Sequence, residues 1–375
     1  MAVCALCPAE LTEHNCTREH IIPNAIGGRL KVAGFICRDC NSTAGNLWEA
    51  ELAKQLNWFS VALNIKRESG TRPPSHVIKT VTGEKLLMHA GGSFTPRDAI
   101  FKWLESVDGR RKFTLSARTV AEAREILKGV QKKHPNSGLQ QILNDLRIAS
   151  QPLEEPVHVE LSIGGPKAGR SIVKTAVAMA SHMSISMTDC AFALRFLIDP
   201  DADAAWSAFH LRDLVKNRPS AHLFHAVTVA GDPNSGRLLG YVEYFGAFRY
   251  IVVLGQDYQG PAVNKTYAIN PVTSEELQLE VALSLSDAEV ALVALDEAGP
   301  IDALKADFEM ALPIVLAVRN THGRDQLLND VITEAFHECG VRPGDDLPPE
   351  RFEEFSARVA EKMAALCIRL HSQGL

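Results

Sequence analysis

Two Cys-x-x-Cys pairs near the N-terminus constrain the fold of this chain more than any other feature of its sequence. The cysteines of these pairs are Cys4, Cys7, Cys37 and Cys40. Each pair can present two thiolates to one ion, and structural zinc prefers four such ligands in a tetrahedron. Because a zinc site of this kind contributes directly to folding, we predict a zinc-stapled module that encloses residues 8–36 between its two cysteine pairs.

Other interpretations of the cysteines stay open. The four could be incidental, or one pair could be a redox dithiol, although two pairs that bracket one motif favour a metal. Cys16 lies between the pairs and could be a free thiol or replace one ligand. The remaining cysteines are scattered, and we expect them to be small buried apolar residues; they are Cys190, Cys339 and Cys367.

Composition limits the class of protein. A chain of 375 residues with 46% hydrophobic and 22% charged residues is typical of a soluble globular protein with two or three domains. We find no apolar run long enough to cross a membrane and no signal peptide, so we expect a reducing cytoplasm, where cysteine pairs usually bind metal. The net charge of −6 argues against an indiscriminate nucleic-acid binder.

The order of predicted elements indicates an α+β fold. We expect a helix over 46–64, a hairpin turning at Thr82-Gly83, a helix over 119–134 capped by Thr119, and a helix over 137–149. Two buried helices follow over 168–183 and 188–198, then antiparallel strands over 221–273, then helices from residue 302 onward. We therefore predict three regions: a zinc-stapled module at 1–70, a larger α+β region at 71–300 and a helical segment at 301–375.

The segment between the cysteine pairs carries side chains that could take part in catalysis. Glu19 to Pro23 reads as a short strand, Gly27-Gly28 permits a sharp turn, and Gly34 to Cys37 reads as the return strand. Asn41 then leads into a helix that starts near Asn46. In an arrangement of strand, loop, strand and helix, we expect Glu19, His20 and Asn41 to converge at the helix start.

These three side chains suit the hydrolysis of a phosphodiester. A carboxylate and an amide oxygen are hard ligands for Mg²⁺ or Mn²⁺, and a neutral imidazole can take a proton from water. A metal beside the scissile phosphate stabilises the leaving oxygen. Two plainer interpretations stay open: Glu19 and His20 could be a surface salt bridge, and Asn41 could cap the helix.

The combined pattern C-A-L-C … E-H-I-I-P-N-A-I-G-G … C-R-D-C-N-S-T-A-G resembles the HNH endonucleases, most closely the bacterial members with an E-H-I-I-P motif between Cys-x-x-Cys pairs. The resemblance covers residues 1 to about 60. It implies a ββα-metal fold and cleavage of nucleic acid. By this resemblance, His20 is the general base, Glu19 and Asn41 hold Mg²⁺ or Mn²⁺, and four cysteines hold structural zinc, namely Cys4, Cys7, Cys37 and Cys40.

One position departs from the family pattern. Many relatives carry an asparagine five residues before the third cysteine, where it fixes the base histidine, and this chain has Val32 there. We expect Asn24 or a backbone carbonyl to take over this role, or the activity to be reduced.

The sequence after residue 70 shows no catalytic motif, so we expect this region to direct or control the module. It could be a specificity domain that grips DNA, or a sensor that binds an activating ligand or protein. The layout is similar to bacterial antiphage systems that join HNH domains to a SAVED domain reading cyclic oligonucleotides, or to a segment that docks on a short Argonaute. We predict a metal-dependent endonuclease acting on DNA in bacterial defence; the alternatives are such a switched effector and a zinc-stapled nucleic-acid-binding module without catalysis.

Overall fold

The computed structural model describes residues 2–107, 110–134, 153, 155–342 and 345–372. It forms two compact units, Met1–Leu316 and Ala317–Leu375. Antiparallel sheets and helices are mixed along the chain, which confirms the predicted α+β class. The predicted division at residues 70 and 300 stays a prediction.

The N-terminal module is a hairpin followed by a helix. Strand β1 (Cys16–His20) pairs antiparallel with β2 (Lys31–Cys37), and α1 (Arg38–Ala44) begins directly after β2. The first strand is shorter at its C-terminal end than predicted, because Ile21 and Ile22 leave the strand and are fully buried. The predicted helix over 46–64 is present as three consecutive pieces: one π-helical turn η2 (Gly45–Glu49), then α2 (Ala50–Gln55) and α3 (Asn57–Ala62).

The turn of this hairpin depends on two glycines, as predicted. It contains the short helix η1 (Asn24–Ile26), which ends at Gly27 with a φ of 102°. A Cβ on Gly28 would lie 1.8 Å from the carbonyl oxygen of Ile22, so no other residue fits there without moving the backbone. The left-handed conformation and the close approach together explain the Gly-Gly pair.

The segment after residue 75 forms two small sheets and a helix. One sheet has the order β5-β4-β3-β8, and the other pairs β6 with β7. The bounds of these strands and of the helix α4 are β3 (His76–Thr80), β4 (Lys85–Met88), β5 (Phe94–Pro96), β6 (Ile100–Val107), β7 (Arg110–Ser116), α4 (Val120–Lys133) and β8 (Val157–His158). The hairpin at Thr82-Gly83 is confirmed, as is the Thr119 cap, whose side chain accepts from the backbone of Glu122. The helix predicted over 137–149 lies outside the described residues.

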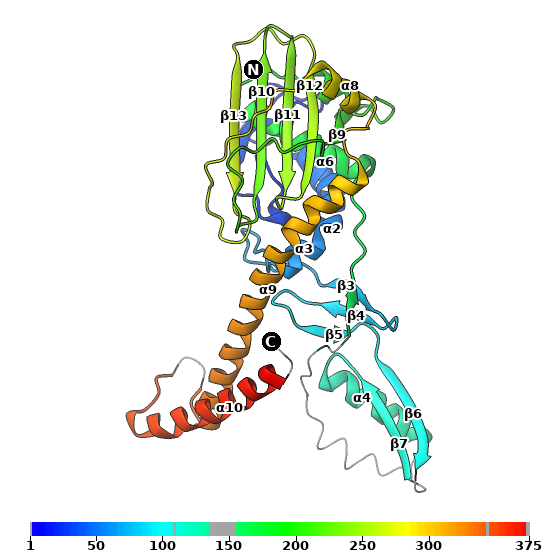
Figure 1. Ribbon diagram of the computed structural model, residues 1–375, viewed down its shortest axis with the longest axis vertical. Helices are drawn as coiled ribbons and strands as arrows, with labels where there is room; N and C mark the ends of the chain where they lie inside the picture. Colours follow the sequence, from blue (N-terminus) through cyan, green and yellow to red (C-terminus); the bar gives the residue numbers. More distant parts are fainter. Residues whose placement is uncertain (1, 108–109, 135–152, 154, 343–344, 373–375) are drawn as a thin grey trace. The chain divides into compact units, whose positions relative to one another are not determined.

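A five-stranded antiparallel sheet forms the largest part of the first unit and confirms the predicted series of strands. Its order is β13-β10-β11-β12-β9. The strands are β9 (Trp206–Ala208), β10 (His225–Asp232), β11 (Arg237–Tyr244), β12 (Phe248–Gly255) and β13 (Val263–Ile269). Helix α6 (Gly165–His182) packs against β10, β11 and β12, and also against β2 and η2 of the N-terminal module (Figure 1). It therefore connects the module to the sheet.

The remaining helices precede or follow the strands of this sheet in the sequence. In the first unit these are α7 (Ala191–Ile198), α8 (Asp287–Ala294) and the beginning of α9 (Ile301–Glu338). Pro313 lies inside α9, which continues as one helix through this residue. The second unit holds the rest of α9, the short η3 (Pro349–Arg351) and α10 (Phe352–Ser372). Among the described residues, no helix combines the length and apolar character needed to cross a lipid bilayer.

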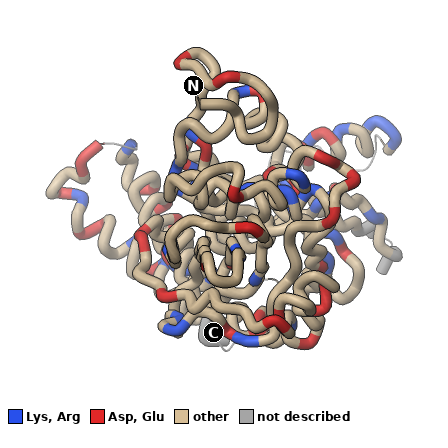
Figure 2. Tube along the Cα trace, turned by 90° about the horizontal axis from the view of Figure 1, so that it is seen from above, with Lys and Arg blue, Asp and Glu red and all other residues tan. Residues whose placement is uncertain are grey.

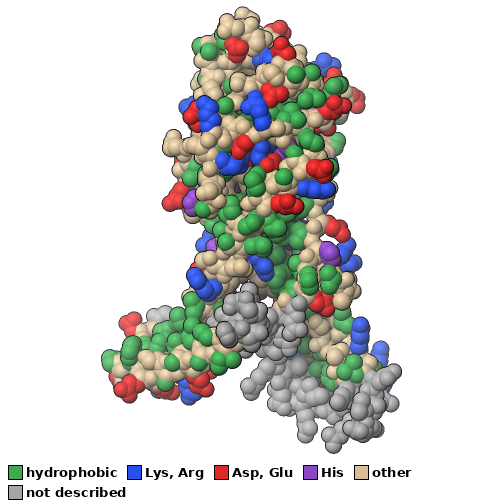
Figure 3. Space-filling model, viewed as in Figure 1, with side chains coloured by type: hydrophobic (Ala, Val, Ile, Leu, Met, Phe, Trp, Pro, Cys, Tyr) green, Lys and Arg blue, Asp and Glu red, His purple; other side chains and the backbone are tan. Residues whose placement is uncertain are grey.

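Charged residues of both signs occur along the whole chain, and residues 301–375, with 13 acidic and 8 basic residues, account for most of the net negative charge. Figure 2 shows Lys and Arg alternating with Asp and Glu along the trace, and Figure 3 shows the same mixture on the face that it presents. This agrees with the modest net charge of −6. Any affinity for nucleic acid must therefore arise from a local group of cations, not from the overall charge.

His225 at the start of β10 links the sheet to the hairpin turn. Its Nε2 donates to the carbonyl oxygen of Ile26 at 2.8 Å, and its Nδ1 accepts from the backbone N–H of Phe245 at 3.1 Å. Only a neutral imidazole can accept from the N–H of Phe245, and complete burial lowers the pKa of His225 to about 4, despite the opposing effect of the Ile26 carbonyl. The turn is thus held against the sheet by a histidine that stays uncharged.

We expect the free energy of unfolding to decrease as the pH is lowered, because of His225. Between an ordinary histidine pKa near 6.5 and about 4, the unfolded chain binds a proton that the folded chain excludes. The contribution of His225 to the free energy of unfolding is therefore fully present above this window and decreases as the pH falls through it. The shift corresponds to about 3 kcal/mol. Urea unfolding at several pH values checks this; in His225→Gln, which cannot titrate, this part of the decrease should vanish, and an unchanged pH dependence would contradict the assignment.

Candidate functional site

The four predicted zinc ligands come together at the base of the module. The Sγ atoms of Cys4, Cys7, Cys37 and Cys40 all lie within 4.8 Å of one another. Those of Cys7 and Cys37 are 3.7 Å apart, close to the roughly 3.8 Å that two sulfurs at 2.3 Å from a tetrahedral zinc would have. Backbone N–H groups of Leu6 and Cys37 point to the sulfur of Cys4. The donor set and its spacing fit a structural zinc ion held by these four thiolates.

Cys16 is not part of this cluster. Within the described residues, the group of potential metal ligands contains only the four cysteines of the two pairs. The sulfur of Cys16 lies instead 3.9 Å from the carbonyl oxygen of Thr17. The structure therefore favours the paired cysteines over the alternative in which Cys16 replaces one of them.

The Glu19-His20 pair lies at the end of β1, where consecutive side chains point to opposite faces. Glu19 lies opposite Val32 in the hairpin, and His20 lies opposite Lys31. Because residues directly opposite each other share a face, Glu19 and Val32 face the buried side together, and His20 and Lys31 face the other side. Val32 therefore lies on the face of Glu19 rather than that of His20.

The carboxylate of Glu19 pairs with a lysine from outside the module. The ammonium of Lys174, in the middle of α6, donates to Glu19 and also to Glu49 at the end of η2. The side chains of Lys174 and Glu19 are only 2% and 6% exposed. Burial raises the pKa of Glu19 to about 7, despite the opposing effect of Lys174. The three groups form a buried cluster with one positive and two acidic members.

Asn41, the other predicted metal ligand, has a different partner. Its Nδ2 donates to Oγ1 of Thr17 at 3.1 Å, two residues before Glu19 on the same strand. A divalent ion bound to Glu19 would compete with the Lys174 ammonium, which already contacts this carboxylate. With Lys174 in this position, Glu19 and Asn41 do not offer a site that fits Mg²⁺ or Mn²⁺.

His20 faces a second charged group. Its Nε2 lies 3.4 Å from Oε1 of Glu68, and Lys31 donates to Oε2 of the same carboxylate at 2.6 Å. The side chain of Asn24 accepts from the backbone N–H of Glu68 at 3.0 Å. Partial burial lowers the pKa of His20, so the imidazole is neutral near pH 7. Asn24, predicted as a replacement for the missing asparagine, thus contacts His20 only through Glu68.

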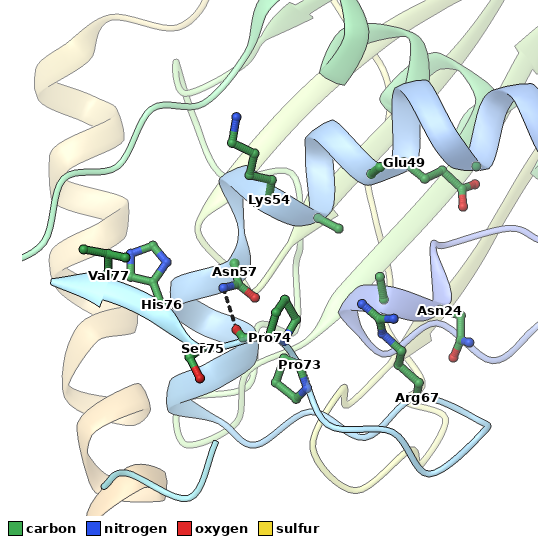
Figure 4. A pocket seen from close by; sticks show the side chains of 14 residues that line it. Asn24, Glu49, Lys54, Asn57, Arg67, Pro73, Pro74, Ser75, His76 and Val77 are labelled. Carbon is green, nitrogen blue, oxygen red and sulfur yellow. Dashed lines mark hydrogen bonds between the residues drawn. The ribbon is translucent and has the colours of Figure 1, made fainter. Parts of the chain in front are cut away.

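Two hollows flank the module. The larger, of about 690 Å³, has Glu49 on one wall and Asn24 and Arg67 on another (Figure 4). The smaller, of about 390 Å³, is lined mainly by charged residues: Arg18, Arg29, Leu30, Lys31, Glu68 and Glu276. His20 contacts Glu68 and lies opposite Lys31, two residues that line the smaller hollow, although His20 itself is not part of the lining. The larger hollow instead reaches the cluster of Glu19, Glu49 and Lys174 through Glu49.

Sequence reasoning missed three residues of this site: Glu49, Glu68 and Lys174. Glu49 lies in the helix predicted over 46–64 and Glu68 lies just after it, and a glutamate at either position carries no signal in the sequence. Lys174 does carry a signal, because it interrupts the apolar run Ser171-Ile-Val-Lys-Thr-Ala-Val-Ala of a buried helix. A buried lysine needs a carboxylate partner, and the sequence does not indicate which one.

The N-terminal module consists of a β-hairpin and a following helix, with four clustered cysteines and a Glu-His pair on the first strand. This combination defines a small module of the ββα-metal type. Residues 4–57 match the family model of the HNH endonucleases. This match confirms an HNH domain at the N-terminus; the likeness to the E-H-I-I-P subgroup stays a prediction. Comparison with curated proteins and with solved structures returns no significant match.

Proposed function

We propose that the N-terminal module is a nuclease that hydrolyses phosphodiester bonds, with DNA as its expected substrate and His20 as the general base. The observation that carries this proposal is the position of His20: a neutral imidazole, in a domain that matches the HNH endonucleases, contacts Glu68 and lies opposite Lys31, and both of these residues line a hollow together with Arg18 and Arg29. These cations suit the phosphates of a nucleic-acid backbone.

The chemistry asked of His20 is a single proton transfer. The imidazole takes a proton from a water molecule as its oxygen attacks phosphorus, the bond from phosphorus to the leaving oxygen breaks, and solvent protonates that oxygen. Because partial burial keeps His20 neutral, the base is ready near pH 7. A divalent ion at Glu19 and Asn41 stays a prediction from sequence, and it requires Lys174 to leave Glu19.

A substrate panel tests the proposal. The full chain, loaded with zinc, is incubated with supercoiled plasmid, single-stranded DNA and RNA, with and without Mg²⁺ or Mn²⁺. We expect strand cleavage, with DNA cut in preference to RNA. Retention of the nucleic acid on gels without any cleavage, by the wild type and also by a Lys174→Met variant in which no ammonium occupies the position beside Glu19, would contradict the proposal and favour the binding-only module.

We expect Glu68 to position His20, in the role that an asparagine at position 32 takes in relatives. Glu68→Gln keeps the shape but removes the charge that faces Nε2 at 3.4 Å. We expect kcat to fall about tenfold with little change in KM, a smaller loss than for a fully buried carboxylate–histidine pair because Glu68 is partly exposed. Glu68→Asp should recover part of the rate, and Glu13→Gln, an exposed acid of the same module, should have no effect. An unchanged kcat in Glu68→Gln would refute the role.

The role of residues 71–375 remains a proposal from domain layout. A specificity region, a SAVED-like reader of cyclic oligonucleotides and a short Argonaute partner are each compatible with the sheet and helices. The link to bacterial defence belongs to the same prediction.

A further inference from the structure

Lys174 is a charged residue in a buried stretch of helix. It lies in the middle of α6, where every residue from Ser171 to Ala180 is buried. Placing an ammonium in such surroundings is costly unless it is paired. The helix does not belong to the HNH domain at residues 4–57, yet its lysine reaches the centre of that domain. This contact requires an explanation beyond packing.

The geometry of the cluster is that of a cation held between two carboxylates. One atom, Nζ of Lys174, contacts Oε1 of both Glu19 and Glu49. A metal ion bound between the same two oxygens would have to occupy the same space. The ammonium and the metal are therefore alternatives at this position, because two cations cannot share it.

We propose that Lys174 acts as a built-in cation of the nuclease centre and competes with divalent metal for Glu19. In the conformation described, the lysine offsets one of the two acidic charges of Glu19 and Glu49 and keeps metal out. Metal binds at Glu19 only when the ammonium withdraws. The relevance to cleavage rests on the proposed nuclease function, whereas the competition for Glu19 does not.

The surroundings allow such an exchange. Glu49 is 19% exposed and lines the hollow of about 690 Å³, so a hydrated ion can approach the cluster from this side. The lysine side chain has four rotatable bonds and can withdraw without movement of the α6 backbone. When it does, two acidic groups remain without a counter-charge, which favours a divalent ion in its place.

The exchange would also connect the centre to the rest of the chain. Helix α6 packs on the strands β10, β11 and β12, so a ligand that shifts the helix on the sheet would move Lys174 relative to Glu19. By linkage, whatever draws Lys174 away strengthens metal binding, and metal binding favours that same state. The region after residue 160 thereby acquires a route for controlling the module.

Titration with Mn²⁺, followed by calorimetry and by the electron paramagnetic resonance of free Mn²⁺, tests the competition in the zinc-loaded full chain. Lys174→Met removes the ammonium and keeps most of the side-chain volume, and Lys167→Met is the matched control, an exposed lysine on the same helix. We expect Lys174→Met to bind Mn²⁺ at least about tenfold more tightly than the wild type. Lys167→Met should match the wild type, and adding Glu19→Gln to Lys174→Met should abolish the gain.

Thermal unfolding provides a second readout. Lys174→Met should have a lower Tm than the wild type without metal, and Mn²⁺ should raise its Tm far more than that of the wild type. Should Lys174→Met fold poorly, Lys174→Gln, which keeps a hydrogen-bond donor, takes its place in both measurements. Equal Mn²⁺ affinity in wild type and variant, or tight Glu19-dependent binding in the wild type, would overturn the proposal. If Lys174→Met binds Mn²⁺ tightly and still cuts no nucleic acid, that result refutes only the nuclease function.

Discussion

Cys37→Ser is expected to release the zinc ion and unfold the N-terminal module. The hairpin and α1 are joined at Cys37, whose sulfur lies 3.7 Å from that of Cys7. A module of this size cannot bury enough apolar surface to replace its metal, and the apparent binding free energy of a structural zinc is about 10 kcal/mol or more. The whole of this contribution depends on four thiolates, so the loss of one should remove most of it.

Metal analysis and circular dichroism of the purified variant check this expectation. We expect one zinc per chain in the wild type and none in Cys37→Ser, with a matching loss of ordered structure. Cys16→Ser is the control, because Cys16 lies in the same module but outside the cluster. Full zinc content and wild-type stability in Cys37→Ser would show that the four cysteines do not hold the metal.

His20→Ala is expected to reduce the rate of cleavage by about 10²- to 10⁴-fold, the usual contribution of a general base. The substitution removes the imidazole that contacts Glu68, a residue that lines the hollow together with Arg18, Arg29 and Lys31. Binding of the nucleic acid should change little, because these cations remain. The loss should therefore appear in kcat and not in KM.

His14→Ala is the matched control for this experiment, since His14 is an exposed histidine of the same module. Both variants should keep their zinc and their melting temperature, so that a loss of activity in His20→Ala alone reports on chemistry. Cleavage that persists in His20→Ala at the wild-type rate would remove His20 from the mechanism.

The local architecture of the module could be predicted from sequence because its determinants are local. Cysteine spacing indicated the metal cluster, Gly27-Gly28 indicated the turn, and the cluster and the turn are both confirmed. Alternation of apolar residues likewise indicated the antiparallel strands of the large sheet. In each case the residues that cause the structure lie within one element or beside it.

The partners of the functional side chains could not be predicted in the same way. Lys174 is 155 residues from Glu19 in sequence, and no periodicity joins them. Glu68 lies beyond the predicted helix and reaches His20 only through the packing of the whole module. Asn41 contacts Thr17, two residues before Glu19 on the same strand, a pairing that the sequence does not indicate; its role as a metal ligand stays a prediction. Pairings of this kind depend on tertiary packing, which a pattern of residue types does not encode.

The contact between His225 and the carbonyl of Ile26 has a consequence for the autonomy of the module. The carbonyl is satisfied by a strand that begins almost two hundred residues later, and Gly27 lies directly against Pro271. A chain cut after residue 70 would expose this turn to water and leave the carboxylate of Glu19 without its lysine. The N-terminal module therefore depends on later parts of the chain for the packing of its turn and for the counter-ion of Glu19.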